Sequence, residues 1–400
     1  MTKFAGPTSV SSSHNYLPDN SLPPSLPTDE LDYGAIIANI PLPQDLDLSG
    51  EVVKVDAFSF ESGKVAEISL GSMVRSQDTK EQKVAIKIFR RIHIDRNMLE
   101  KTVRDLYDEA REWTRLEHPN VLPFFGIALD LGPSPALIAP FCNSGRIMRY
   151  LTDVPNSPQE RLAFAFGIAQ GLAYLHAQGL VHGNLTTKKV LINDAGFPVI
   201  CGYGLANVSG QLSENTVISP SARFTAPEYF IDESTQNHAA LKTTAGDVYS
   251  LSMVILEIIS GLRPYHDLHN ELSVVLHILP GGRPSRSELD PLLVSDRFWG
   301  FLKHLWSHHP ALRPDMNRVL LGLQSLSQSG SEKPEGGQAE SGPFVFESNA
   351  EDSEREEEVS FGVWVSCFSK ATLADLARYS ASIPGGDKLP RSQRSPFQNR

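Results

Sequence analysis

Two hydrophobic patterns follow each other in a fixed order along residues 48–327, and this order limits the fold more than any other feature. Stretches rich in β-branched residues come first, at residues 52–55 and 83–89, and a helix is expected over residues 97–116. The sequence therefore predicts one α+β domain with a small β-rich lobe, a larger helical lobe and a cleft between them. The helical lobe is indicated by apolar residues at helical spacing, such as Ala165, Ile168, Leu172 and Leu175.

Both flanks differ in composition from this domain. Residues 1–47 are rich in serine and proline, with one short apolar patch at Ala35, Ile36 and Ile37. Residues 328–400 form a tail of low complexity that is acidic in its first half and basic in its second. Segments of this composition bury too little apolar surface to order themselves, so we expect disorder in both flanks.

The totals exclude several classes of protein. A net charge of −11 argues against a nucleic-acid partner. Three widely spaced cysteines form neither a disulfide framework nor a zinc site, so we expect a reducing, cytoplasmic compartment. The longest apolar run, residues 251–259, is interrupted by Ser252 and Glu257 and is too short for a membrane span.

Short motifs in a fixed order then point to one family. Each motif is weak alone, but the series covers about 280 residues of the chain, and it resembles the eukaryotic protein kinases, closest to their tyrosine-kinase-like serine/threonine branch. The motifs, in chain order, are Val84-Ala85-Ile86-Lys87, Glu109 followed by His118-Pro119-Asn120-Val121, His182-Gly183-Asn184-Leu185, Gly202-Tyr203-Gly204-Leu205, Ala226-Pro227-Glu228, Asp247-Val248-Tyr249-Ser250, and Trp306 with Arg313-Pro314.

The resemblance implies that the structural positions of the family are kept. Glu228 and Arg313 stand where the family has a buried ion pair that ties the activation segment to the large lobe. Asp247 stands where an aspartate accepts backbone N–H groups of the catalytic loop, and His182 belongs to the apolar spine that links the lobes. The resemblance also places Ile68, Ala85 and Leu191 around an adenine ring.

The positions that carry the chemistry are changed. The catalytic aspartate is replaced by Asn184, whose neutral amide is no base, and the catalytic-loop lysine is replaced by Thr186. The two magnesium ligands are replaced by Gly202 and Lys189, so we expect no metal. No catalytic residue of the family is therefore intact.

The phosphate-covering loop is also altered. Aligning Ile68 with the valine of the family's glycine-rich loop puts Glu61, Gly63 and Ala66 on its glycine positions. A carboxylate at Glu61 would repel a phosphate, and only Gly63 keeps the backbone freedom of a glycine. Because Gly71 permits another register, the alignment of this loop stays open.

The sequence leaves two interpretations open for the pair Lys87 and Glu109, and two for Lys189. Lys87 and Glu109 either hold nucleotide phosphates, as the resemblance implies, or form a structural salt bridge between strand and helix. Lys189 either points inward and replaces a magnesium charge, or is a solvated surface lysine.

The sequence thus predicts a catalytically impaired pseudokinase that acts as a scaffold or allosteric regulator in intracellular signalling. Its partners are expected to be proteins, an active kinase among them, and ATP binding is expected to be weak and independent of magnesium. The alternative is an active, atypical serine/threonine kinase, which the fold alone would assign. The sequence names neither the partner nor the oligomeric state.

Overall fold

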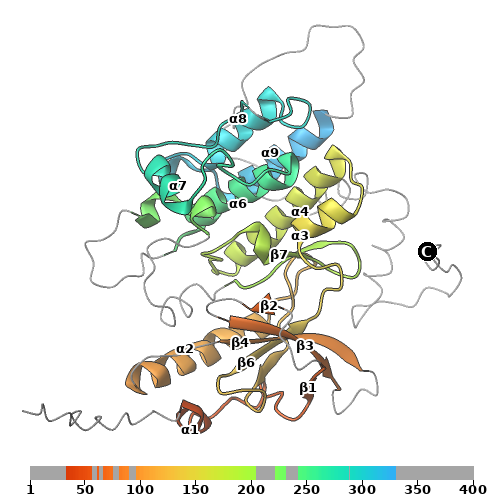
Figure 1. The fold of residues 1–400 in the computed structure, drawn as a ribbon, viewed down its shortest axis with the longest axis vertical. Coiled ribbons are helices and arrows are strands. Elements are labelled where there is room, and N and C mark those ends of the chain that lie inside the picture. Colours follow the sequence, from red (N-terminus) through yellow and green to blue (C-terminus); the bar gives the residue numbers. More distant parts are fainter. Residues whose placement is uncertain are drawn as a thin grey trace, which may run out of the picture.

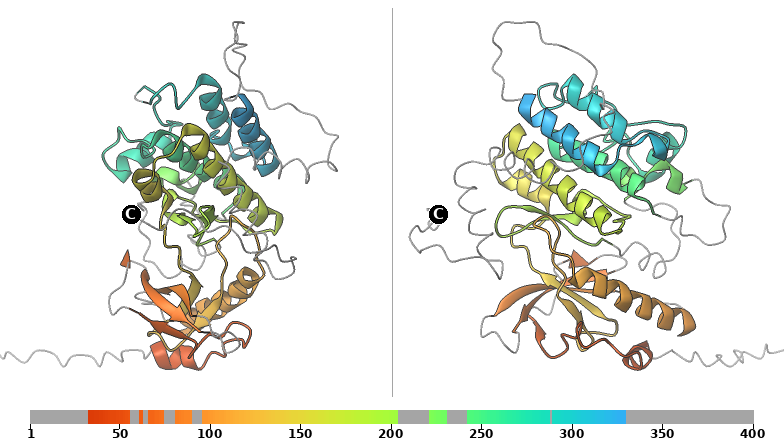
Figure 2. Two further views of the ribbon diagram at one scale, coloured as in Figure 1. Left: turned by 90° about the vertical axis from the view of Figure 1, so that its right-hand side faces the viewer. Right: turned by 180° about the vertical axis from the view of Figure 1, so that it is seen from behind.

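The computed structural model describes residues 33–55, 61–62, 66–74, 81–89, 96–203, 221–230, 242–287 and 289–329. These residues form a small lobe of strands with one long helix and a larger lobe of helices, which are stacked along the long axis (Figures 1 and 2). The predicted bilobal α+β fold is therefore confirmed.

The small lobe is built on a sheet with the strand order β1-β3-β4-β6-β5, in which all neighbours are antiparallel and β2 pairs with β3 as well. Helix α2 (Arg96–Thr114) accompanies the sheet and agrees with the helix expected over residues 97–116 within two residues at either end. The strands are β1 (Val52–Lys54), β2 (Glu61–Ser62), β3 (Ala66–Met73), β4 (Gln82–Phe89), β5 (Gly126–Ala128) and β6 (Ala136–Pro140).

Buried and partly exposed residues alternate along the middle of strand β4, and this alternation distinguishes the two faces of the sheet. Val84 and Ile86 are fully buried and Ile88 is 4% exposed, and all three pack into the core of the small lobe. Ala85 and Lys87 lie on the opposite face and stay partly exposed, because successive side chains of a strand point to opposite sides. The motif that ends in Lys87 therefore presents its lysine away from the core.

The large lobe is organised around α6 (Thr244–Ser260), which is buried along almost its whole length. Helix α4 (Pro158–Ala177) packs beside it and begins with a capping box, in which Ser157 and Glu160 bond each other's backbone N–H groups. The other elements are α3 (Ile147–Asp153), β7 (Val190–Ile192), β8 (Pro198–Ile200), α7 (Glu271–Ile278), α8 (Asp296–Leu305), α9 (Met316–Ser329) and four 3₁₀ helices, Thr187–Lys189, Ala222–Phe224, Pro227–Phe230 and Pro310–Leu312.

The prediction of a disordered segment over residues 1–47 differs from the structure over residues 33–47. Residues Tyr33–Ala38 form the short helix α1, which lies beside α2 (Figure 1). Ile36, Ile37, Ile40 and Leu46 are buried, and burial of one such side chain stabilises a fold by about 1.5–3 kcal/mol. The apolar patch of Ala35, Ile36 and Ile37 was the one sign of this contact, but the sequence does not show its partner, because the apolar surface it covers comes from α2, far along the chain.

The other end of the domain lies close to its expected position. Helix α9 runs to Ser329, two residues beyond the predicted end at residue 327. The tail predicted for residues 328–400 otherwise lies outside the described residues. Among the described helices, none combines the length and the apolar character needed to cross a membrane.

Candidate functional site

The candidate site consists of residues on β3 and β4 of the small lobe and on β7 and β8 with their flanks in the large lobe, where Lys87 senses the charge of Lys189. Ile68 is the direct cross-strand partner of Lys87, so their side chains share one face of the sheet, and Ala85 lies on that face two residues away. Leu191 is the one partly exposed residue of β7, between the buried Val190 and Ile192. The three residues expected around an adenine ring are thus partly exposed, as a ligand contact requires.

Lys189 points inward, and this answers the question that the sequence left open. Its Nζ lies 2.9 Å from the place that a Cβ on Gly202 would take. The two residues are also tied through the backbone, because the N–H of Cys201 donates to the carbonyl of Lys189 at 2.9 Å. An ammonium group therefore lies where the side chain of the missing aspartate would begin.

Lys87 and Lys189 come from different lobes and repel each other. The pKa of Lys87 is lowered to about 7. Burial is the largest cause and the positive charge of Lys189 adds to it, while Cys201 acts in the opposite direction. The Nζ of Lys87 lies 5.1 Å from the ring centroid of Phe89, a cation–π distance. The charge of Lys189 is thus close enough to lower the pKa of Lys87.

Glu109 does not neutralise Lys87. Within the part of the chain that the structure describes, no ion pair joins the two side chains, and the buried Oε2 of Glu109 has no hydrogen-bond partner. Burial, and then the charge of Asp105, raises the pKa of Glu109 to about 7. The structure therefore does not form the salt bridge that one of the two interpretations of Lys87 and Glu109 requires.

The catalytic loop keeps the backbone contacts that the resemblance implies. The backbone N–H groups of His182 and Gly183 donate to the carboxylate of Asp247 at 2.7 and 2.8 Å, and Nε2 of His176 lies 3.0 Å from the same group. The N–H of Asn184 donates to Nδ1 of the buried His182 at 3.3 Å. The backbone around Asn184 is thus held by Asp247, as the resemblance implies.

Thr186 does not replace the missing lysine of the catalytic loop. Its side chain is 6% exposed and carries no charge. Its carbonyl accepts a hydrogen bond from the N–H of Lys189 at 2.8 Å, which begins the 3₁₀ turn Thr187–Lys189. The turn directs Lys189, and not residue 186, toward the site.

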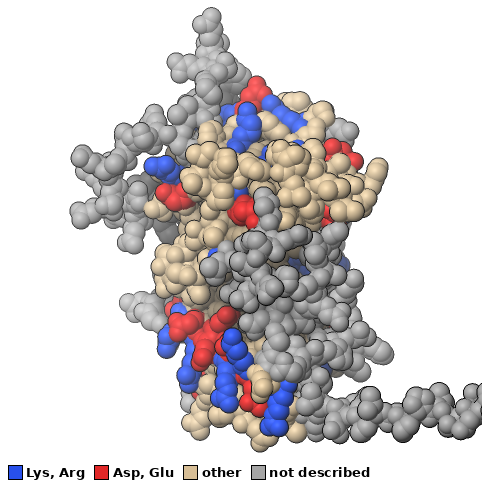
Figure 3. All heavy atoms as spheres, turned by 90° about the vertical axis from the view of Figure 1, so that its left-hand side faces the viewer, with Lys and Arg blue, Asp and Glu red and all other residues tan. Residues whose placement is uncertain are grey.

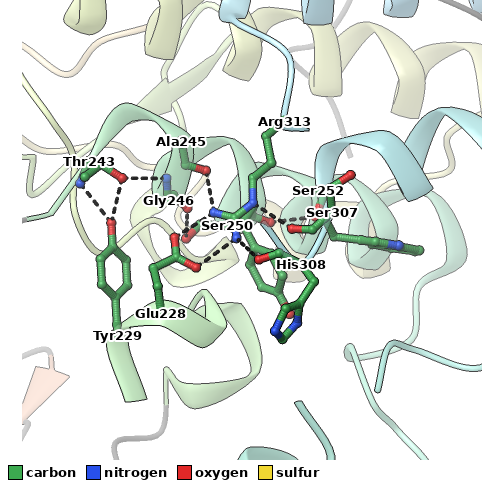
Figure 4. A network of polar contacts seen from close by, with 12 residues as sticks. Glu228, Tyr229, Thr243, Ala245, Gly246, Ser250, Ser252, Ser307, His308 and Arg313 are labelled. Carbon is green, nitrogen blue, oxygen red and sulfur yellow. Dashed lines mark hydrogen bonds and ion pairs between the residues drawn. The ribbon is translucent and has the colours of Figure 1, made fainter. Parts of the chain in front are cut away.

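The ion pair of Glu228 and Arg313 is bidentate and buried on the arginine side (Figure 4). Nη1 and Nη2 of Arg313 donate to the two carboxylate oxygens of Glu228 at 2.7 and 2.8 Å, and the arginine side chain is 0% exposed. The same guanidinium also donates to the carbonyls of Ser307 and Ala245 at 2.9 and 3.0 Å. The segment that carries Glu228 is thereby fixed to the large lobe.

Arg223 is a structural residue that the sequence analysis missed. It is 1% exposed, and its Nε donates to Glu271 of α7 at 3.0 Å. Its other nitrogens donate to the carbonyls of Pro264, Tyr265 and Leu268 at 2.6–2.9 Å. No pattern in the sequence separates this arginine from a surface arginine, because its partners are backbone carbonyls far along the chain.

The glycine-rich loop is only partly visible. Glu61 pairs directly with Ile68 across β2 and β3, and this agrees with the alignment that places Ile68 on the valine position. Ala66 is the first residue of β3. Gly63 lies outside the described residues, and the expectation for it stays a prediction.

The side chains at the site do not fit a magnesium ion. Gly202 has no side chain and Lys189 brings a positive charge to the place of a carboxylate, whereas magnesium requires oxygen ligands. No group of three histidine, cysteine, aspartate or glutamate side chains that could hold a metal occurs in the described ranges.

The order of the lobes, the open face of β4 and the loop held by Asp247 define the protein-kinase class of fold. The family described as "Protein tyrosine and serine/threonine kinase" matches residues 58–323. The chain belongs to this family. The match covers the strands from β2 on and all helices of the large lobe up to α9.

Known relatives of the chain are protein kinases by name. Serine/threonine-protein kinase STY17 of Arabidopsis thaliana is 28% identical over 266 residues, which are 66% of this chain and 44% of that protein. Its relative STY46 is 24% identical over 300 residues, 74% of this chain and 49% of that protein. Mitogen-activated protein kinase kinase kinase 12 of Rattus norvegicus is 25% identical over 229 residues, 57% of this chain and 24% of that protein. The chain thus spans about half the length, or less, of these relatives.

Proposed function

We propose that this protein is a pseudokinase that binds the phosphates of ATP with Lys87 and Lys189, without magnesium, and transfers no phosphate. The observation that carries the proposal is the ammonium of Lys189 beside Gly202, at the place of the missing metal ligand. A fixed ammonium group supplies the positive charge that a magnesium ion would otherwise bring to the phosphates.

The two lysines are suited to an anion because, among the described residues, no carboxylate forms an ion pair with Lys87. Burial and mutual repulsion make the charged form of Lys87 unfavourable in the free protein. A polyphosphate placed between the lysines would remove this repulsion and accept charge-assisted hydrogen bonds from both, each contributing about 1.5–3 kcal/mol. Without metal bridges the affinity is expected in the high-micromolar range, about −5 to −6 kcal/mol.

A scaffold or regulatory role through protein partners follows from what the chain keeps. The networks of Glu228 with Arg313 and of Arg223 with α7 hold a defined surface on the large lobe, although no catalytic group needs it. A kinase fold with a rigid surface and no catalysis acts by binding. An active kinase is the partner that we propose first, because kinase-like lobes offer it a surface of its own kind.

The competing function is an active, atypical serine/threonine kinase. It is favoured by the relatives STY17 and STY46, which are serine/threonine-protein kinases. It requires another base in place of Asn184 and another way to hold the metal. Magnesium-dependent incorporation of phosphate would distinguish it from the pseudokinase that we propose.

The phosphate site is tested by removing one ammonium group at a time. In EDTA, ATP should raise the melting temperature of the wild-type chain, and Lys87→Met or Lys189→Met should remove most of this shift. Lys188→Met is the matched control, since Lys188 is the exposed neighbour of Lys189 and should keep the full shift. An equal loss in all three variants would show that net charge, and not this site, attracts the nucleotide.

Metal-free ATP affinity should fall as the pH rises above 7. Lys87 has a pKa of about 7 in the free protein, and a bound phosphate raises this pKa, so binding takes up a proton. Between pH 7.5 and 8.5 the affinity should therefore fall by up to about tenfold. Glu109, with a pKa of about 7, gains negative charge over the same range and acts in the same direction.

Isothermal titration at several pH values measures this dependence. Lys87→Arg keeps its positive charge throughout the range and should bind with an affinity that changes little with pH. A wild-type profile as flat as that of Lys87→Arg would contradict a titrating lysine in the phosphate site.

A further inference from the structure

A hollow in the surface of the large lobe lies apart from the site described above. It has a volume of about 420 Å³ and is formed by residues 281–284 after α7, by α8 and by residues 306–308 after α8. Pro284 and Trp306 are buried and Trp299 is half-buried, and the rings of the two tryptophans meet edge to face with their centroids 5.1 Å apart. The apolar part of the lining is therefore largely aromatic.

The charged part of the lining is cationic. Arg283, Lys303 and His308 line the hollow, and none of its eight lining residues is an aspartate or a glutamate. The small lobe differs, because on α2 Arg96 pairs with Glu100 at 3.1 Å, and Figure 3 shows Lys, Arg, Asp and Glu side chains interspersed over the lower part of the molecule. The hollow thus favours a ligand that is both anionic and aromatic or apolar.

Two of these residues can donate to an anion. Lys303 is exposed, and no acidic side chain in the described part of the chain pairs with it. Nη2 of Arg283 donates to Nδ1 of His308 at 3.4 Å, and since arginine is only a donor, Nδ1 is the acceptor. The proton of a neutral His308 then lies on Nε2, from which it can be donated to a carboxylate.

The backbone around the hollow is held in place by two arginines. Nε of Arg283 donates to the carbonyl of Trp306 at 2.8 Å. Arg313 donates to the carbonyls of Ser307 and His308 at 2.9 and 3.3 Å, beside its ion pair in Figure 4. A ligand would therefore meet a lining whose backbone is already fixed, which lowers the entropic cost of binding.

The chain itself contains a segment of complementary chemistry. Residues 344–358 begin with Phe344-Val345-Phe346 and continue with seven acidic residues against Arg355 as the one basic residue. They combine aromatic rings for the tryptophans with carboxylates for the cations.

This segment follows α9, which brings the chain close to the hollow. Helix α9 packs beside α8, and Nη2 of Arg297 on α8 donates to Oγ of Ser325 on α9 at 2.6 Å. Trp299 is two residues beyond Arg297, about 3 Å along the helix axis. Residues 330–343 connect α9 to the segment and could span up to roughly 45–50 Å if fully extended. A tethered segment within reach has an effective concentration of roughly millimolar order, so weak contacts are enough to dock it.

We propose that residues 344–358 dock on this hollow of the same molecule. The rings of Phe344 and Phe346 pack on the tryptophans, and the carboxylates that follow pair with Lys303 and His308. A protein partner that uses this part of the large lobe would have to displace the segment. The inference does not depend on nucleotide binding, because no residue of the phosphate site takes part.

The test joins the two sides by a cross-link of zero length in the full chain. A carbodiimide couples an amine to a carboxylate in contact with it, so docking should give an amide between Lys303 and a carboxylate of residues 347–358, identified by mass spectrometry. Lys101, an exposed lysine of α2, is the reference amine and should form no such link. A mixture of isotope-labelled and unlabelled chains distinguishes links within one molecule from links between two.

Variants of the tail separate the segment from its charge. Phe344→Ser combined with Phe346→Ser should lower the yield of the Lys303 link by about tenfold, because the aromatic anchor is lost. The amides of residues 344–358 should also exchange hydrogen at least about tenfold faster in this variant than in the wild-type chain. The control combines Glu332→Gln, Glu335→Gln and Glu340→Gln, which removes negative charge outside the segment and should change neither measurement.

Three outcomes would overturn the inference. A link that forms equally at Lys101, or that the two Phe substitutions leave unchanged, would show attraction by charge alone. Links found only between labelled and unlabelled chains would assign the segment to a second copy of the chain. Absence of the Lys303 link would show that the hollow does not take this segment, and protected amides in residues 344–358 would then mean that the segment docks elsewhere.

Discussion

Purified protein is expected to transfer phosphate from ATP to protein at a rate more than about 10⁴-fold below that of an active kinase, which turns over at roughly 1–100 s⁻¹. Loss of the general base at Asn184 lowers a rate by about 10²–10⁴. The absence of a metal ligand at Gly202, with a cation beside it, removes most of the charge neutralisation of the transferred phosphate. These effects are not additive, but each acts on the same step.

Repair of the base alone should not restore activity. Asn184→Asp would return a carboxylate to a loop that Asp247 already holds in place, but Lys189 and Gly202 would still exclude the metal. Gly202→Asp would place a side chain at φ 74°, which costs an L-residue about 1–2 kcal/mol, next to the ammonium of Lys189. Only the variant that combines both changes with Lys189→Asn should gain magnesium-dependent binding of ATP.

Transfer is measured with radiolabelled ATP, on the protein itself and on a generic acceptor protein. Lys87→Met is the control for a contaminating kinase, since it should leave the background unchanged. Magnesium-dependent autophosphorylation that Lys87→Met abolishes would contradict the pseudokinase function and favour the active kinase.

Arg313→Ala is expected to lower the free energy of unfolding by about 3–5 kcal/mol. The substitution leaves the Glu228 carboxylate without the bidentate partner that Figure 4 shows. It also removes the donors to the carbonyls of Ser307 and Ala245. Because Arg313 is fully buried, water cannot replace these contacts without opening the lobe.

Urea denaturation of the purified variants measures this loss. The matched control is Arg149→Ala, which removes an exposed pair with Asp153 on α3 and should cost no more than about 1 kcal/mol. Equal costs for the two arginines would show that the Glu228–Arg313 pair is not the fixed point between activation segment and large lobe that the structure indicates.

The sequence predicted those contacts that follow from its motifs. Glu228, Asp247 and Arg313 are single residues with fixed partners, so the resemblance alone names both ends of each contact. The lobes followed from local periodicity, because β4 alternates with a period of two and the helices of the large lobe repeat with the period of a helix.

The sequence could not predict contacts that depend on the direction of a side chain or on a distant surface. The sequence allows Lys189 to point inward or outward. In the structure it follows a 3₁₀ turn and points toward Gly202, which has no side chain. Whether Glu109 pairs with Lys87 depends on where α2 lies relative to β4, and the sequence of either element does not show this. Both the direction of Lys189 and the pairing of Glu109 depend on tertiary packing.

The central claim is that the site between the lobes takes a nucleotide with two lysines in place of a metal. The most direct test is an isothermal titration of the full chain with ATP in EDTA and again in excess magnesium. Binding in the high-micromolar range should occur in EDTA and should gain nothing from magnesium, because Lys189 lies where the ion would be held. Binding that appears only with magnesium would contradict this account and would mean that the chain holds a metal by other residues.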